Sequence, residues 1–234
     1  MKLSVIIPTY NERATIEEIL RRVRAVPLEM EILIVDDGST DGTLEHLAGL
    51  GGPDLRLFRH DRNRGKGAAF RTALPHTTGD VVVIQDADLE YDPREFPRLI
   101  EPIARGEADA VYGSRFLGRG RRASRLGHYA VNRFLTLLSN LFTGLRLSDM
   151  ETCYKAFRGD LVRGLPLVSD GFEIEPELTW RAARAGARFR ELPISYAGRG
   201  YGEGKKIDWR DGVRTLATIL RLGRVRRSRE DRWR

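Results

Sequence analysis

The sequence has 234 residues, a formal net charge of +7 and a single cysteine. This length can bury a full hydrophobic core, so stability requires neither a disulfide nor a structural metal, and one cysteine forms no intramolecular disulfide. No stretch approaches the roughly 18 consecutive apolar residues of a membrane-spanning helix, and no signal-peptide pattern opens the sequence. We therefore expect a cytoplasmic protein, soluble or peripherally attached to a membrane.

Charge is distributed unevenly along the chain. Residues 1–112 carry 14 Lys and Arg against 20 Asp and Glu, whereas residues 113–234 carry 26 against 13. The acidic half suits a bound cation, and the basic half suits phosphates, anionic lipid or nucleic acid, although a solvated basic surface explains the second half equally well. Lysine is rare and occurs only at positions 2, 66, 155, 205 and 206, which suggests that a compact ammonium is needed there.

Strand and helix patterns alternate through the first half of the chain. The expected strands are the apolar runs 3–7, 31–35, 55–58, 81–84 and 108–112. The expected helices cover 15–24, a segment beginning near 41–43, 66–74 and 93–104. Such alternation is typical of a parallel sheet covered by helices on both faces. Ligands of these sheets bind beyond the carboxyl ends of the strands.

The second half is less regular. A loop rich in Gly and Arg at 118–124 precedes an expected helix at 126–145, and helices at 173–185 and 208–221 flank a strand at 189–196. The apolar residues of 126–145 recur at helical spacing, which suits core packing at least as well as contact with a bilayer. Because no repeat or flexible linker divides the chain, we expect one domain at 1–221 and a basic tail at 222–234.

The usual glycine-rich nucleotide loops do not follow the first expected strand. That position reads Pro8-Thr9-Tyr10-Asn11-Glu12, so a dinucleotide-dependent dehydrogenase and a P-loop enzyme are disfavoured. The basic second half is also compatible with a non-catalytic nucleic-acid-binding module. Such a module has no use for the paired carboxylates at 86 and 88, and it would interleave aromatic residues with its arginines, which this sequence does not do.

Two expected strands end in carboxylates, one followed by Asp36-Asp37 and the other by Asp86-Ala87-Asp88-Leu89-Glu90. Alternation in an extended segment turns Asp86, Asp88 and Glu90 to the same side. Acidic residues after strands often only cap helices, but like charges directly after an apolar strand repel unless a cation lies between them. We therefore predict a Mg²⁺ or Mn²⁺ site with these three candidate ligands, completed by substrate phosphates.

The combination and order of several motifs resemble the family 2 glycosyltransferases, which have the GT-A fold. The motifs lie at 8–12, 35–43, 63–69 and 86–88, and Gly113-Ser114-Arg115-Phe116 further resembles the dolichyl- and polyprenyl-phosphate mannosyl- and glucosyltransferases. The resemblance implies a Rossmann-like α/β fold with a mainly parallel sheet, helices on both faces and a single domain. It also implies a metal-dependent, inverting hexosyltransferase.

The resemblance further implies a donor site. The residues implied to bind the nucleotide sugar are Pro8, Tyr10, Glu12, Asp36, Asp37, Lys66, Gly67, Asp86, Arg199 and Lys205. Of these, Arg199 and Lys205 resemble a loop that closes over the donor diphosphate, for which a solvated loop is the alternative. Relatives often carry Gln where this chain has Glu90.

An acceptor site is implied in the same way. Arg115 would meet the acceptor phosphate with the help of Arg122 or Arg125, between which the sequence does not decide. A further matching motif begins at Asp149, which would lie at the reaction centre, and ends at Lys155, which would also bind the acceptor phosphate. The implied catalytic residues are Asp88, Asp149 and Arg115. Because a phosphate monoester is already deprotonated near neutral pH, Asp149 would orient a substrate or stabilise charge at the anomeric carbon rather than act as a strong base.

The implied partners are a nucleotide-diphosphate sugar, of the GDP-mannose or UDP-glucose type, and a polyprenyl or dolichyl phosphate. The enzyme would then act peripherally on the inner face of the membrane, with a membrane-spanning partner protein in place of the C-terminal spans that some relatives carry. One alternative is a family 2 enzyme with a soluble acceptor, such as a phosphoglycerate or a saccharide. Nucleic acid is not an expected partner.

Overall fold

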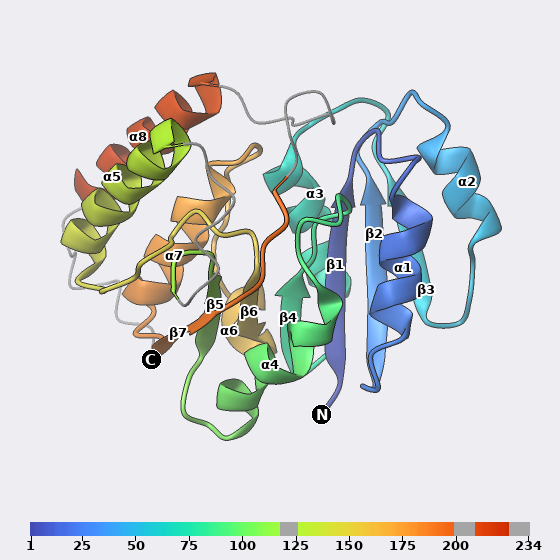
Figure 1. Cartoon of the computed structure of the whole chain (residues 1–234), viewed down its shortest axis with the longest axis horizontal. Helices are drawn as coiled ribbons and strands as arrows, with labels where there is room; N and C mark the ends of the chain where they lie inside the picture. The colour runs from blue at the N-terminus through green and yellow to red at the C-terminus, as the bar shows by residue number, and fades with distance from the viewer. Residues whose placement is uncertain (118–125, 199–208, 225–234) are drawn as a thin grey trace.

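Seven strands form one sheet in the computed structural model, which describes residues 1–117, 126–198 and 209–224. The strands are β1 (Leu3–Thr9), β2 (Met30–Asp36), β3 (Leu55–Arg59), β4 (Val81–Ile84), β5 (Ala110–Ser114), β6 (Lys155–Arg158) and β7 (Phe189–Pro193). Their order is β3-β2-β1-β4-β6-β5-β7 (Figure 1). Strand β6 is antiparallel to β4 and β5, and every other neighbouring pair is parallel. The expected mainly parallel sheet is confirmed.

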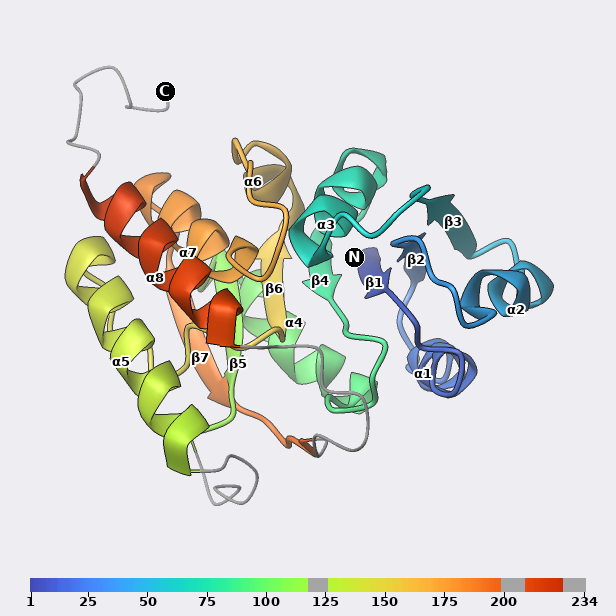
Figure 2. The same ribbon diagram turned by 90° about the horizontal axis from the view of Figure 1, so that it is seen from above.

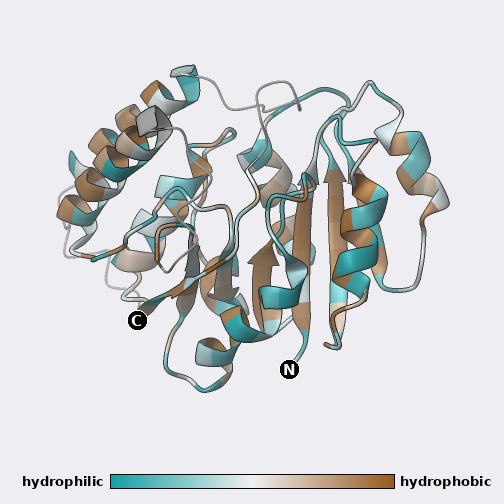
Figure 3. Ribbon diagram, in the orientation of Figure 1, coloured by the Kyte–Doolittle hydropathy of each residue, from teal (hydrophilic) through white to brown (hydrophobic). Residues whose placement is uncertain are grey.

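Helices cover both faces of the sheet, as expected. The α-helices are α1 (Ile16–Arg24), α2 (Thr43–Gly49), α3 (Lys66–Ala73), α4 (Phe96–Ala104), α5 (Leu126–Thr143), α6 (Gly159–Arg163), α7 (Ile174–Arg184) and α8 (Trp209–Arg224), with 3-10 turns η1 (Leu74–His76) and η2 (Pro93–Glu95). One apolar core lies under α1, α2 and α4, and the other lies under α3 and α5 to α8. The strands between these cores are mostly apolar (Figure 3).

Helices α5 and α8 form an outer layer. They lie side by side beyond α7 and away from the sheet (Figure 2). Helix α8 continues to Arg224, and Leu222 on it is buried, so the expected boundary between domain and tail at residue 221 falls inside a helix. Within the described residues, no helix has both the length and the apolar character needed to cross a membrane.

The sequence patterns missed the short helix α6 and the strand β6, of which β6 is the one that shapes the site. It is only four residues long and begins and ends with a basic residue, so it lacks the apolar run by which a buried strand is recognised. Because β6 runs against β4 and β5, it starts at the edge of the sheet where those two strands end. The segment just before β6, residues 149–154, therefore lies at the same edge as the carboxylates that follow β4.

Candidate active site

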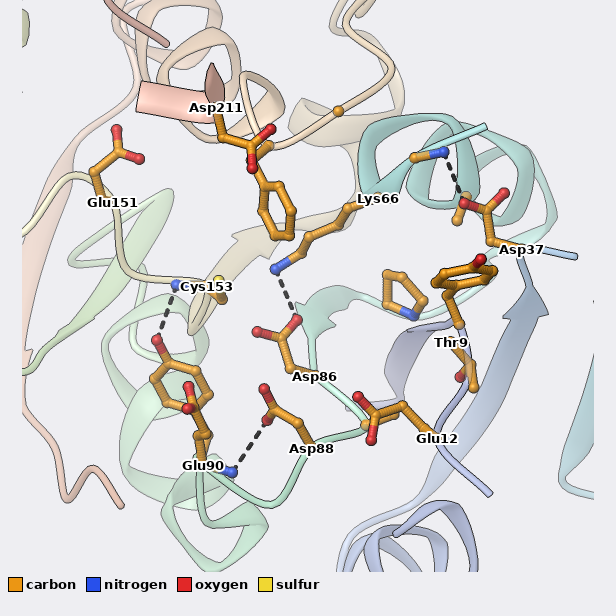
Figure 4. Close-up of a pocket in the computed structure, with 18 of the residues that line it drawn as sticks. Thr9, Glu12, Asp37, Lys66, Asp86, Asp88, Glu90, Glu151, Cys153 and Asp211 are labelled. Carbon is orange, nitrogen blue, oxygen red and sulfur yellow. Dashed lines mark hydrogen bonds and ion pairs between the residues drawn. The ribbon is translucent and has the colours of Figure 1, made fainter. Parts of the chain in front are cut away.

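A cleft of about 540 Å³ opens at the carboxyl edge of the sheet. It lies beside a crossover between strands, where ligands of open α/β sheets bind. The last residues of strands and the residues that follow them form much of its wall, and the segment before β6 adds more (Figure 4). From these segments come Pro8, Thr9, Tyr10, Glu12, Asp37, Asp86, Asp88, Glu90, Arg115, Glu151 and Cys153.

At one end of the cleft, Asp37 organises the loop that leads into α3. Its carboxylate accepts hydrogen bonds from the backbone N–H of Arg64 at 2.9 Å and of Gly65 at 2.7 Å, and it lies 2.6 Å from Nδ1 of His60. Gly65 has φ +99°, and a Cβ there would meet the carbonyl oxygen of Asp170. Asp37 thereby fixes the backbone beside Lys66, the first residue of α3.

Two non-glycine residues of the described chain have a positive φ, Asn11 at 50° and Leu89 at 65°. They lie in the loops that follow β1 and β4, which both border the cleft. Asn tolerates left-handed backbone, but for Leu it is unfavourable, and strained backbone of this kind collects at functional sites. At Leu89 the sharp turn lets the backbone N–H of Glu90 donate to Asp88 Oδ1 at 3.1 Å, which holds that carboxylate against the cleft wall.

Lys66 lies in the middle of the cleft between two acidic groups. Its Nζ is 2.7 Å from Asp86 Oδ1 and 3.2 Å from Glu175 Oε1, and the other oxygen of Glu175 contacts Lys155. Burial by itself would lower the pKa of Lys66, but the negative charges, chiefly that of Asp86, raise it well above its ordinary value. Lys66 is therefore a permanent cation. Desolvation alone would raise the pKa of Asp86, but the charge of Lys66 lowers it below its ordinary value.

The expected three-carboxylate metal site is only partly assembled. Glu90 Oε2 accepts a hydrogen bond of 2.8 Å from the Tyr196 hydroxyl, and the described residues contain no group of three or more His, Cys, Asp or Glu side chains that could hold a metal ion. Asp86, Asp88 and Glu90 all line the cleft. Two carboxylates fit Mg²⁺ or Mn²⁺ when phosphate oxygens of a substrate complete the coordination, and Glu90 is not needed for this arrangement.

Arg115, at the other end of the cleft, is held by a buried carboxylate. Its Nε and an Nη lie 2.7 and 2.8 Å from the two oxygens of Asp149, and its backbone N–H donates to the same group at 3.0 Å. Asn132 adds a hydrogen bond of 3.2 Å, and the backbone N–H of Asp149 donates to Glu191 on β7. Asp149 is 0% exposed. It therefore lies behind Arg115, which differs from its expected place at the reaction centre.

Glu151, two residues beyond Asp149, lines the cleft. Within the described part of the chain its Oε1 is shielded from solvent and has no hydrogen-bond partner. Burial, more than any neighbouring charge, raises the pKa of this carboxyl group to about 7. Glu151 is thus an ionisable group that opens into the cleft and can change its charge near neutral pH.

Other expected site residues lie away from the cleft surface. Lys155 is 0% exposed, and its ammonium donates to the Thr152 carbonyl at 2.6 Å besides contacting Glu175. It has no surface with which to meet an acceptor phosphate, so we correct its expected role to a structural one. Asp36 is also buried and accepts from the backbone N–H of Ser39. Gly67 packs against the Ser169 carbonyl, where a Cβ would clash.

Pro8, Tyr10, Glu12 and Asp37 do line one region of the cleft, and Lys66, Asp86 and Asp88 line its middle. Arg122, Arg125, Arg199 and Lys205 lie outside the described residues.

Sequence patterns gave no role to Glu151 or Glu175, which belong to the central charge network and the cleft wall. The signal for Glu151 was its place within the motif that begins at Asp149. The signal for Glu175 was indirect, since two of the five lysines, Lys66 and Lys155, converge on it.

A charged cleft of this kind, at the carboxyl edge of a mainly parallel sheet, is typical of α/β enzymes that bind nucleotides. Comparison with known proteins then gives the family. Residues 4–165 match the model of Glycosyl transferase family 2, and the chain belongs to this family.

Two relatives illustrate its position in the family. The chain is 33% identical over 215 residues to an undecaprenyl-phosphate mannosyltransferase of Micrococcus luteus, covering 88% of this chain and 87% of the relative. It is 32% identical to a dolichol-phosphate mannosyltransferase of Pyrococcus furiosus, again covering 88% of this chain but only 59% of that longer protein.

Solved structures support the fold. The chain resembles glucosyl-3-phosphoglycerate synthase from Mycobacterium tuberculosis, solved with Mn²⁺, uridine diphosphate and glucosyl-3-phosphoglycerate, with a TM-score of 0.74 and 24% identity. The match covers 97% of this chain and 81% of that one. The expected GT-A-like α/β fold is thereby confirmed.

Proposed function

We propose that this glycosyltransferase transfers a hexose, with inversion, from a nucleotide sugar of the GDP-mannose or UDP-glucose type to the phosphate of a polyprenyl or dolichyl lipid. The observation that carries the proposal is the pairing of two charged regions in one cleft. Asp86, Asp88 and Lys66 line its middle, and Arg115 lines it on the side of Glu151 and Tyr196. The names of the relatives in Micrococcus luteus and Pyrococcus furiosus favour the lipid phosphate as acceptor.

The donor would bind with its base and ribose against Pro8, Tyr10, Glu12 and Asp37 and with its diphosphate near Asp86 and Asp88. A divalent cation held by these two carboxylates would neutralise the charge that develops on the departing nucleoside diphosphate. Lys66 contributes a second positive charge to the same region. Its high pKa keeps it protonated throughout the neutral range, so it can stabilise the leaving group without a proton transfer.

The acceptor would bind through Arg115, whose guanidinium suits a phosphate. The bidentate pair with Asp149 fixes the orientation of Arg115, and a single guanidinium can serve both groups because it carries five N–H donors. The lipid phosphate is itself the nucleophile and is already anionic. Asp149 is therefore a positioning residue for Arg115, and the reaction requires no strong base from the protein.

The outer face of α5 supports a lipid acceptor. Val131, Phe134, Leu137 and Leu141 are between 53% and 75% exposed, and they recur at helical spacing along one stripe. The last turn of the neighbouring helix α8 carries two exposed basic residues, Arg221 and Arg224. An apolar stripe beside basic residues fits a helix that lies in the interface of an anionic bilayer. The enzyme would then work peripherally on the cytoplasmic face of a membrane, with or without a membrane-spanning partner.

A transfer assay tests the acceptor. The purified chain with Mn²⁺ or Mg²⁺ receives radiolabelled UDP-glucose or GDP-mannose together with undecaprenyl phosphate, dolichyl phosphate, 3-phosphoglycerate or a saccharide. We expect label to enter the organic phase only with a polyprenyl-type phosphate. Transfer restricted to a soluble acceptor would instead identify the alternative activity, and the absence of transfer with every donor would contradict the proposal.

The α5 stripe is tested separately by flotation with vesicles that contain an anionic phospholipid. Leu137→Ser and Leu141→Ser together should reduce vesicle binding about tenfold, because each change removes exposed apolar area that would enter the interface. Thermal stability should change little, since both side chains are largely solvent-exposed. Equal flotation of the variant and the unaltered chain would mean that another surface contacts the membrane.

A further inference from the structure

Glu151 lines the cleft and carries an acceptor atom without a hydrogen-bond partner in the part of the chain that the structure describes. Its Oε1 is shielded from solvent, and no donor within the described residues reaches it. A buried polar atom without a hydrogen bond destabilises a protein, and such atoms are uncommon enough to require a reason. Because Glu151 lines the cleft, a bound ligand with a hydrogen-bond donor would supply the missing partner.

The order of residues along the cleft indicates which part of a ligand lies near Glu151. Figure 4 shows Asp37 and Thr9 on one side, Lys66 and Asp86 in the middle, and Glu151 on the opposite side. A nucleotide sugar has the same linear order, in which the nucleoside, the diphosphate and the hexose follow one another. With the diphosphate at Asp86, a nucleoside on the side of Asp37 leaves the hexose on the side of Glu151.

Charge distinguishes the hexose from the acceptor as the partner of Glu151. A carboxylate repels a lipid phosphate, whereas a sugar hydroxyl donates a hydrogen bond to it. The nearby cation Arg115 is already held in a bidentate pair by Asp149, so Glu151 is not needed as its counter-ion. Asp149 itself is wholly buried and cannot reach a sugar, which leaves Glu151 as the carboxyl group of this segment that opens into the cleft.

We propose that Glu151 binds a hydroxyl group of the transferred hexose and thereby helps to select the sugar. This inference rests on the proposed function, because it requires a nucleotide sugar in the cleft. The carboxyl group accepts from the hydroxyl when ionised. In its neutral form, which is accessible since its pKa is about 7, it also donates.

Calorimetric titration separates the hexose from the rest of the donor. With Mn²⁺ present, UDP, UDP-glucose, GDP and GDP-mannose are titrated into the unaltered chain, Glu151→Ala and Glu151→Gln. For the nucleotide sugar that binds best, Glu151→Ala should weaken binding about tenfold or more, as the loss of a charge-assisted hydrogen bond does. Its nucleoside diphosphate, which lacks the hexose, should bind within about twofold of the unaltered chain.

Donor analogues that lack single hydroxyl groups sharpen the test. One such deoxy analogue should bind the unaltered chain about tenfold more weakly than its parent sugar, and this penalty should disappear in Glu151→Ala. Glu151→Gln keeps the side-chain volume and a neutral hydrogen bond, so its affinity for the nucleotide sugar should fall by only about threefold. The amide variant also carries the test if the alanine variant fails to fold. The exposed Glu107→Ala is the matched control and should leave all affinities unchanged.

The outcomes separate the two proposals. If no nucleotide sugar binds the unaltered chain, the proposed function fails and this inference fails with it. If a nucleotide sugar binds and is transferred, but Glu151→Ala weakens the sugar and the nucleoside diphosphate equally or weakens neither, the proposed function stands and the role of Glu151 is refuted.

Discussion

The two ends of the cleft are built in different ways. At the first end, which for this comparison runs from Asp37 to Asp88 in the middle of the cleft, the carboxylates follow parallel strands and accept hydrogen bonds from backbone N–H groups of nearby loops. At the other end, Arg115 follows β5 but is oriented by Asp149, which precedes the antiparallel strand β6. The backbone of Asp149 is held in turn by Glu191 on β7. At the first end, backbone N–H groups hold the carboxylates in place. At the second end, side chains from segments far apart in the sequence hold one another in place.

This difference predicts how each end responds to mutation. Removal of the partly exposed carboxylate of Asp88 should affect activity and little else, whereas removal of Asp37, which is buried and holds the loop before α3, should also affect stability. Removal of one member of the Arg115–Asp149 pair leaves a charge in a buried place, so it should affect stability as well. Comparison of Asp88 with the Arg115–Asp149 pair therefore tests whether a cleft residue affects activity alone or stability as well.

The largest effect is expected at the first end. Asp88→Ala should reduce the turnover number about a thousandfold, because in the proposed function Asp88 would hold the divalent cation, whose loss removes several kcal/mol of transition-state stabilisation. The unfolding temperature should fall by only a few degrees. Initial rates at saturating donor and acceptor measure the first quantity, and thermal unfolding measures the second. A variant that keeps its rate, or that loses activity only by unfolding, would break the contrast between the two ends.

At the second end, Arg115→Met leaves Asp149 buried without its cation. We expect the free energy of unfolding to fall by about 3–5 kcal/mol, since breaking a buried pair is more unfavourable than replacing it. Activity should fall too, by lost acceptor binding. The double variant Arg115→Met/Asp149→Leu should regain much of the stability but none of the activity. Urea unfolding and rate measurements on the three proteins check this, and additive losses of stability would show that the pair is not coupled.

The same contrast explains which parts of the molecule the sequence patterns predicted. Strands such as β1 and β4 are continuous apolar runs, and ligands of parallel sheets bind where those strands end, so Asp37, Asp86 and Asp88 could be assigned to the cleft from local patterns. The second end of the cleft depends on β6, which has no apolar run and is recognised only by its pairing with β4 and β5. Without β6, the positions of Asp149 and Glu151 relative to Arg115 could not be derived.

Lys155 shows the same limit for a single residue. Its motif indicated an acceptor ligand, but the first residue of a central antiparallel strand points its side chain into the protein. Glu175 from α7, 20 residues away in the sequence, neutralises it there. The motif indicates that a cation is required at position 155, but it does not indicate which carboxylate pairs with that cation.

Lys155→Met tests this structural role with a smaller expected effect. The methionine fills a similar volume, and Glu175 keeps its second cation, Lys66, at 3.2 Å. We therefore expect the free energy of unfolding to fall by about 2–3 kcal/mol, at the lower end of the range for broken buried pairs. The KM for the lipid phosphate should stay within about twofold of its original value. A large rise in that KM with unchanged stability would restore Lys155 to the acceptor site.

The smallest expected effect concerns the pH dependence of stability at Glu151. Its folded-state pKa of about 7 lies above the ordinary value of 4.5, because burial disfavours the ionised form. The facing charges are those of Lys155, Glu175, Arg115 and Asp149. A raised folded pKa means that the folded state binds the proton more tightly than the unfolded chain. The resulting stabilisation is complete below about pH 4.5 and is lost as the pH rises through about 7.

Glu151→Gln removes this titration, so the variant should gain stability relative to the unaltered chain as the pH rises from 5 to 8, by on the order of 1–2 kcal/mol. Urea unfolding at both pH values measures the difference. Glu107→Gln, on the exposed surface, should show no such change and serves as the control. Glu151 lies at the end of the cleft that is built from contacts between distant segments. If the free energy of unfolding of Glu151→Gln changed with pH in the same way as that of the control, its carboxyl group would be solvated, and this end would be as open to solvent as the first.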